Sequence, residues 1–189
     1  LAVCGEAADA RVGLAAAAKL RPDVVIADLT MDEGNGLDLI KDLHLRQPGL
    51  PVLVLSMHHE NLYAERAVRA GARGYVMKRE PVAAVLAALR KVLAGQMALS
   101  EEIVLRMLDA PARARKAAAS PAEVLSDREL EVFRLLGQGS GTRQIAEKLR
   151  LATSTVESYR AGIKQKLGLA RATELVARAA QFVLDEPRR

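Results

Sequence analysis

The sequence is poor in cysteine, histidine and aromatic residues. Its 189 residues include one Cys, three His, three Tyr, two Phe and no Trp. Cys4 alone cannot form an intrachain disulfide, and so few His and Cys give no ligand cluster for zinc. The sequence has neither the run of about 20 apolar residues that spans a membrane nor the pattern of a signal peptide. We therefore expect a soluble cytoplasmic protein with aliphatic cores and no structural metal.

Excess positive charge is confined to the second part of the chain. Residues 1–110 carry 13 basic and 14 acidic side chains, whereas residues 111–189 carry 15 and 9. The imbalance indicates a nearly neutral first module joined to a module that meets a polyanion. A charge surplus can also belong to an ordinary solvated surface.

The chain divides into two modules of different pattern. Residues 109–123 contain two prolines, three basic residues and no apolar residue larger than Ala, which is typical of a linker. We place a first domain at residues 1–98, the linker at 99–124 and a second domain at 125–189. This division separates two regions that differ in their expected secondary structure.

The first module has the pattern of an α/β protein. Strand candidates lie at residues 2–4, 23–28, 51–56 and 74–78, and helix candidates near 10–20, 36–46, 61–70 and 82–94. Continuous apolar strands that alternate with helices predict a doubly wound parallel sheet covered on both faces.

The second module is predicted to be small and all-α. Helices are expected at about residues 127–137, 142–149, 154–167 and 171–184. Ser126 and Ser154 each precede a Glu by three residues, at Glu129 and Glu157, which predicts two capping boxes.

Polar residues end three of the strand candidates in the first module. They are Asp28, Ser56 and Lys78. Because the carboxyl ends of parallel strands share one sheet edge, these side chains are expected to meet there. A carboxylate nucleophile, a hydroxyl and an ammonium group suit phosphoryl transfer. Each residue alone has an ordinary explanation as a strand-end or surface residue.

The first module resembles the receiver domains of two-component response regulators. The matching residues are Asp28-Leu29-Thr30-Met31, Asn35-Gly36, Leu55-Ser56-Met57 and Ala70-Gly71-Ala72-Arg73-Gly74-Tyr75-Val76-Met77-Lys78. The resemblance implies that a histidine kinase phosphorylates Asp28 with bound Mg²⁺, and that Ser56, Tyr75 and Lys78 form the switch. An alternative for Tyr75 is a half-buried aromatic residue of a strand.

Two features depart from the receiver pattern. Asp32 and Glu33 follow the acceptor where the family usually has Pro. Residues 1–6 resemble the family's second strand, so its first strand and helix, about 30 residues, and the acidic pair that binds Mg²⁺ have no counterpart. Asp28 would then be only a partial metal site. Either the natural polypeptide begins before Leu1, which we favour, or the receiver is incomplete and not phosphorylated.

The second module has the pattern of a helix-turn-helix. Residues 150–153 separate the second helix from a longer third helix. Val156, Tyr159, Ile163 and Leu167 recur at helical spacing and should face the core. The opposite face is polar, small or basic, as a helix in the major groove of DNA needs. It carries Glu157, Ser158, Ala161, Lys164 and Gln165.

The second module is similar to the LuxR-type DNA-binding domain. The matching residues are Leu125-Ser126, Arg128-Glu129, Glu131-Val132, Gly139, Ile145-Ala146, Leu149, Ser154-Thr155-Val156-Glu157, Tyr159-Arg160, Ile163 and Lys166-Leu167-Gly168. The DNA contacts that this resemblance implies are Thr142, Arg143, Ser154, Thr155, Glu157, Ser158, Arg160, Ala161 and Lys164. Glu157 could contact a cytosine amino group or instead be held in the capping box with Ser154. Lys166 could contact phosphate or be a solvated charge. The residues Leu175, Val176 and Ala179 form an apolar stripe. Some of them must pack on their own domain, and the remainder are candidate dimer contacts.

Together these resemblances identify the chain as a response regulator transcription factor of the NarL/FixJ subfamily and not an enzyme. We expect a homodimer that binds double-stranded promoter DNA, has no membrane association and is phosphorylated by a histidine kinase. Two alternatives are a phosphorylation-independent regulator whose receiver is a dimerisation module and an adaptor that binds a partner instead of DNA. A small hydrolase is disfavoured because the sequence has no nucleophile elbow, phosphate-binding glycine loop or metal-ligand spacing.

Overall fold

The computed structural model describes residues 1–31, 35–113 and 120–185. The chain forms two compact units, Leu1–Arg113 and Ala114–Arg189. Asp32 and Glu33, which depart from the receiver pattern, lie outside the described residues.

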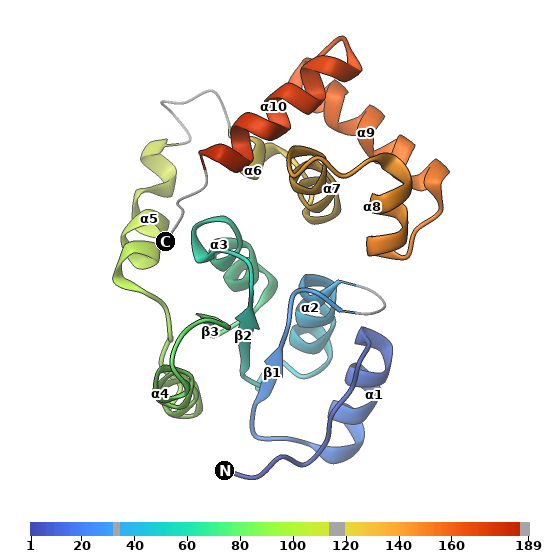
Figure 1. Ribbon diagram of the computed structural model, residues 1–189. Helices are drawn as coiled ribbons and strands as arrows, with labels where there is room; N and C mark the ends of the chain where they lie inside the picture. Colours follow the sequence, from blue (N-terminus) through green and yellow to red (C-terminus); the bar gives the residue numbers. More distant parts are fainter. Residues whose placement is uncertain (32–34, 114–119, 186–189) are drawn as a thin grey trace. The chain divides into compact units, whose positions relative to one another are not determined.

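A parallel sheet lies at the centre of the first unit (Figure 1). Its three described strands are β1 (Val25–Ala27), β2 (Val52–Ser56) and β3 (Gly74–Met77), in the order β1-β2-β3. Val25 is paired with Val52, and Leu53 with Gly74. Helices α2 (Gly36–Arg46) and α3 (Glu60–Ala70) connect the strands, α1 (Ala10–Leu20) precedes them, and α4 (Val82–Leu93) and α5 (Glu101–Arg113) follow. The predicted α/β fold with parallel strands is confirmed.

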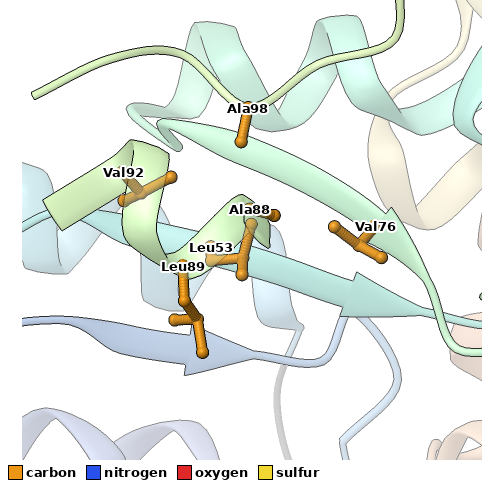
Figure 2. Packing of buried hydrophobic residues seen from close by; sticks show 6 residues of the cluster. All are labelled: Leu53, Val76, Ala88, Leu89, Val92 and Ala98. Carbon is orange, nitrogen blue, oxygen red and sulfur yellow. The ribbon is translucent and has the colours of Figure 1, made fainter. Parts of the chain in front are cut away.

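Helix α4 covers one face of this sheet. Its residues Ala88, Leu89 and Val92 pack against Leu53 of β2 and Val76 of β3, as Figure 2 shows. Val52 and Val54, the neighbours of Leu53, point to the opposite face because side chains alternate along a strand. Both are 0–1% exposed. Strand β2 is therefore buried on both faces, which explains its continuous apolar run.

The strand predicted at residues 2–4 is wrong. No regular structure is assigned over residues 1–7, and Leu1 and Val3 are 82% and 79% exposed. A strand forms only beside a partner that completes its hydrogen bonds. Residues 2–4 pair with no strand among the described residues, whose sheet has β1 at its edge. Ile26 of this edge strand is 48% exposed.

Helix α5 occupies much of the stretch that the sequence placed in the linker. Ile103 is buried, and the Asn61 amide of α3 donates a hydrogen bond of 2.9 Å to Glu102 of α5. The linker prediction rested on Pro111 and the small residues around it, whereas the helix is held in place by residues nearer its start. The first unit therefore extends to Arg113.

The second unit is helical throughout its described regular structure. It contains α6 (Pro121–Val124), α7 (Asp127–Gly137), α8 (Thr142–Leu149), α9 (Thr153–Leu167) and α10 (Ala172–Leu184). Its interior is formed by one large aromatic residue, Phe133, and by aliphatic side chains that are fully buried. These include Leu130, Ile145, Val156, Ile163 and Leu175. The four predicted helices are confirmed, with the short α6 in addition.

Only the first of the two predicted capping boxes forms. The Ser126 backbone N–H donates to Glu129 Oε2 at 2.7 Å, and the Glu129 N–H donates to Ser126 Oγ at 3.4 Å. Helix α9 instead begins at Thr153 with Ala152 as its N-cap and no side-chain cap. Because the helix starts early, Ser154 lies inside the first turn and the second predicted box is wrong.

Glu129 also ties the start of α7 to the end of α9. Lys166 Nζ donates to Glu129 Oε2 at 2.6 Å, and the Glu129 side chain is 9% exposed. Burial raises the pKa of the Glu129 carboxyl, but the hydrogen bonds from Lys166 and Ser126 outweigh it and hold the pKa below its ordinary value. Lys166, which the sequence left between a phosphate contact and a solvated charge, thus has a structural partner.

Glu129→Gln is expected to lower the free energy of unfolding at neutral pH by about 1–2 kcal/mol, because a charged hydrogen-bond acceptor is lost. Since the folded-state pKa is depressed, the carboxylate stabilises the fold above its ordinary value of 4.5 and loses that effect as pH falls through the folded value. Urea unfolding at neutral and acidic pH measures this. The difference from wild type should shrink in acid. Equal stability of wild type, Glu129→Gln and the surface control Glu147→Gln at neutral pH would contradict the expectation.

Candidate functional site

The carboxyl ends of the three strands bring the predicted acceptor residues together. Asp28 directly follows β1, Ser56 ends β2 and Lys78 directly follows β3. Lys78 Nζ lies 2.7 Å from Asp28 Oδ2, and their side chains are 40% and 28% exposed. The backbone N–H of Lys78 also donates to the Ser56 carbonyl at 2.8 Å. A partly exposed carboxylate is thus paired with an ammonium group at the sheet edge.

The backbone around Asp28 holds the carboxylate in one orientation. Asp28 Oδ1 accepts a hydrogen bond of 3.2 Å from the N–H of Thr30. Asn35 caps α2 by accepting from Leu37 N–H at 2.9 Å. A Cβ at Gly36 would lie 2.1 Å from the Asp28 carbonyl oxygen. The Asn35-Gly36 pair therefore lets α2 begin directly against the acceptor backbone.

Ser56 and Tyr75 both bond to the backbone of His58. Ser56 is fully buried, and its Oγ accepts from His58 N–H at 3.2 Å. The Tyr75 ring is 4% exposed, and its hydroxyl donates to the His58 carbonyl at 2.8 Å. The two predicted switch side chains therefore hold the same loop between β2 and α3.

Sequence reasoning missed Thr30 and His58. Thr30 Oγ1 lies 3.1 Å from His58 Nε2, and the His58 ring stacks on Tyr63 with centroids 4.7 Å apart. The contact links the segment after Asp28 to the loop that Ser56 and Tyr75 hold. One signal could have indicated it, since each residue lies two positions after a polar strand end.

The described residues do not by themselves form a Mg²⁺ site. Each oxygen of the Asp28 carboxylate already accepts a hydrogen bond, Oδ1 from Thr30 N–H and Oδ2 from Lys78 Nζ. Mg²⁺ prefers octahedral oxygen ligands. Over residues 1–31, 35–113 and 120–185, no group of three or more His, Cys, Asp or Glu side chains is placed to hold a metal. Asp28 is at most one ligand.

Helix α9 has the amphipathic form expected of a recognition helix. Val156 and Ile163 are fully buried, while Tyr159 and Leu167 are partly buried. The opposite face is open to solvent except at the half-buried Lys164. It carries Glu157, Ser158, Ala161, Lys164 and Gln165. Helix α8 ends at Leu149, and its C-cap Arg150, with a left-handed φ of 52°, turns the chain toward α9.

Three of the predicted DNA contacts bond to one another. Thr142 Oγ1 donates to Glu157 Oε1 at 2.8 Å, and Arg160 donates both to Thr142 Oγ1 and, at 3.2 Å, to Glu157 Oε1. Glu157 is therefore bonded to Thr142 and Arg160 and not to the Ser154 capping box.

The other predicted DNA contacts lie on α8 and α9 without joining this group. Arg143 lies 3.4 Å from Glu147, and Ser158 Oγ donates to the Ser154 carbonyl at 3.0 Å. Thr155 is partly buried, and Ala161 is exposed. The side chain of Lys164 makes no hydrogen bond or ion pair with any described residue. It is therefore available to an external anion.

Two of the three predicted dimer contacts are interior residues of their own domain. Leu175 and Ala179 are completely buried, and α10 packs so closely on α7 that a Cβ at Gly137 would lie 2.2 Å from the Ala179 carbonyl oxygen. Val176 is 41% exposed. The stripe on α10 is thus used mainly for its own core, and only Val176 stays a candidate for pairing.

None of the helices in the described part of the chain has the length and apolar character that crossing a membrane requires.

Comparison with known proteins supports both modules. Residues 1–90 match the response regulator receiver domain, and residues 123–179 match the bacterial regulatory proteins of the luxR family. The chain is 34% identical over 171 residues to the oxygen regulatory protein NreC of Staphylococcus aureus (strain MRSA252), covering 88% of this chain and 79% of that protein. It is 32% identical over 187 residues to the DNA-binding transcriptional activator DevR/DosR of Mycobacterium tuberculosis, covering 99% and 86%.

Solved structures agree with this assignment. RcsB from Salmonella enterica serovar Typhimurium, bound to promoter rprA with a phosphomimetic, is 27% identical, has a TM-score of 0.57 and covers 95% of this chain and 85% of that one. A LuxR-family response regulator from Aurantimonas sp. SI85-9A1 is 31% identical with a TM-score of 0.53, covering 59% and 79%. The chain therefore belongs to the two-component response regulators of the NarL/FixJ subfamily, which join a receiver domain to a LuxR-type helix-turn-helix domain.

Proposed function

We propose that this response regulator binds promoter DNA through α8 and α9 and that a histidine kinase phosphorylates it on Asp28. One observation carries the phosphoryl-transfer part, the 2.7 Å pair of Asp28 and Lys78 at the carboxyl ends of parallel strands. The position is the one at which open α/β sheets bind ligands. A function at promoter DNA also places the protein in the cytoplasm.

The chemistry assigned to the receiver follows from its own side chains. An Asp28 carboxylate oxygen attacks the phosphorus of a phosphohistidine, a P–O bond forms and the P–N bond to the donor breaks. Lys78 offsets the negative charge that accumulates on the phosphoryl oxygens. Ser56 Oγ, which accepts from His58 N–H at 3.2 Å, would turn to donate to a phosphoryl oxygen. That turn breaks the hydrogen bond between Ser56 Oγ and His58 N–H, which frees the loop between β2 and α3 to move.

Basic residues on α8 and α9 support the DNA-binding part. Arg143 is 89% exposed at the start of α8, and Lys164 lies on the polar face of α9 without a described partner. Such residues bind phosphates while small side chains such as Ala161 allow close approach to base edges. The RcsB structures include complexes with promoter DNA and dimers bound to DNA. We therefore also assign this chain a homodimer on paired half-sites, to which Val176 is a candidate contributor.

A second candidate is regulation without phosphorylation, with the receiver acting as a dimerisation module. It is favoured by the Tyr75 hydroxyl, which already donates to the His58 carbonyl in the unmodified chain. Tyr75 thus adopts this inward, hydrogen-bonded conformation without a phosphoryl group on Asp28.

Lys164→Ala tests DNA binding and is expected to weaken the affinity for every duplex by about five- to tenfold, because one cation that meets phosphate is removed. The slope of log affinity against log salt should fall by about one. Fluorescence anisotropy of labelled duplexes over a salt series measures both.

Lys166→Ala is the matched control on the same helix. Because Lys166 is bonded to Glu129, this change should reduce stability and leave the salt slope unchanged. An unchanged slope in Lys164→Ala would remove Lys164 from the phosphate contacts. Failure of the wild-type chain to bind any duplex at low salt would favour the adaptor that binds a protein partner.

A further inference from the structure

A glutamate lies at the centre of the surface that is assigned to DNA. Glu157 Oε1 accepts from Thr142 Oγ1 at 2.8 Å and from Arg160 at 3.2 Å, and Arg160 also donates to Thr142. These residues come from the first turn of α8 and from two successive turns of α9. A negative charge on a surface that meets polyphosphate lowers the affinity unless it has another role.

We propose that Glu157 is the internal counterion of Arg160 and that it sets sequence discrimination by withholding Arg160 from arbitrary DNA. The inference deepens the proposed DNA-binding function and rests on it. Glu157 is a positioning residue, because it acts through Arg160. It also discriminates between bases, because its carboxylate accepts hydrogen bonds from some base edges and repels others.

The exposures of the two arginine pairs on this surface differ. The Arg160 side chain is 19% exposed and bonds to two partners, so its position is fixed. The Arg143 side chain is 89% exposed and lies 3.4 Å from Glu147, which is itself 68% exposed. A highly exposed pair of this kind contributes little. Glu157 therefore restrains its arginine, and Glu147 does not.

The free oxygen of Glu157 supplies the discrimination. Glu157 is 56% exposed, and its Oε2 has no hydrogen bond to any residue that the structure describes. A carboxylate only accepts hydrogen bonds, so in the major groove it is favoured beside the amino groups of cytosine or adenine. It is disfavoured beside the acceptor atoms of guanine and thymine.

The two effects act together. Where an amino group is within reach, Glu157 gains a partner for Oε2 and Arg160 can be shared with a phosphate. Where only acceptors are presented, Arg160 stays neutralised by Glu157 and the carboxylate repels the DNA. Removing the charge of Glu157 should therefore tighten binding to arbitrary DNA and reduce the difference between sequences.

The experiment compares Glu157→Gln with Glu147→Gln, since both raise the net charge by one on the same unit. Fluorescence anisotropy of the full chain on a duplex of arbitrary sequence gives the affinity and the salt slope. Selection from a randomised duplex pool, followed by sequencing, gives the discrimination. Far-UV circular dichroism checks that both variants stay folded.

Glu157→Gln is expected to bind the arbitrary duplex about three- to fivefold more tightly, with a salt slope steeper by about one. The sequences selected from the pool should share a weaker base preference than those selected by the wild type. Glu147→Gln should change the affinity by less than about twofold. Equal gains in the two variants would mean that only net charge matters and would overturn the proposal, as would weaker or unchanged binding by Glu157→Gln. A wild-type chain that binds no DNA would instead overturn the proposed function together with this inference.

Discussion

Asp28→Asn abolishes phosphoryl transfer to this chain and leaves its fold unchanged, as we expect from the geometry of the acceptor. The amide is nearly isosteric with the carboxylate, and its oxygen can still accept from Thr30 N–H, as Oδ1 does at 3.2 Å. The amide has no negative charge to attack phosphorus and cannot form the 2.7 Å ion pair with Lys78. The expected loss of acceptance is complete, with a change in stability of about 1 kcal/mol at most.

Intact mass spectrometry after incubation with a small phosphodonor and Mg²⁺ measures the result. Wild type should gain one phosphoryl group and Asp28→Asn none. Asp38→Asn is the matched control, because Asp38 is an exposed residue of α2 that pairs only loosely with Lys41 at 3.4 Å. An adduct on Asp28→Asn would place the acceptor elsewhere. A wild-type chain without an adduct would favour the phosphorylation-independent regulator.

The sequence predicted the parts of the fold whose signals are local. Strands β2 and β3 are continuous apolar runs, and a polar residue ends or directly follows each. Parallel topology then brings Asp28, Ser56 and Lys78 to one edge without any knowledge of contacts. The capping box at Ser126 marks the start of α7 for the same reason, since its two hydrogen bonds join residues only three apart.

Other features depend on partners that no local pattern names. Residues 2–4 have strand-forming side chains but pair with no strand among the described residues, and they are irregular. The Ser154-Glu157 spacing satisfies the rule for a capping box, yet Glu157 bonds to Thr142 on another helix. The contact of His58 with Thr30 joins residues 28 positions apart, and spacing from the strand ends alone does not specify it. Tertiary contacts override local preference at each of these positions.

Helix α10 illustrates the same limit, and Leu175→Ala tests it with a large expected effect. Leu175 is completely buried against the core of the helical unit, so its truncation leaves a cavity. The expected cost is about 2–5 kcal/mol in the free energy of unfolding of that unit. Hydrogen exchange of the buried part of α9, around Val156 and Ile163, reports this opening free energy without interference from the receiver.

Val176→Ala, one residue further along α10, is the matched control. Because Val176 is 41% exposed, its truncation should change stability by less than about 0.5 kcal/mol. Sedimentation velocity over a concentration series gives self-association, which Val176→Ala should weaken if α10 pairs two copies. If Leu175 were instead a dimer contact, Leu175→Ala would leave the opening free energy unchanged and reduce only self-association. Protected α9 amides in Leu175→Ala would therefore contradict the burial argument, because a residue cannot both fill the core of its domain and cover a second copy.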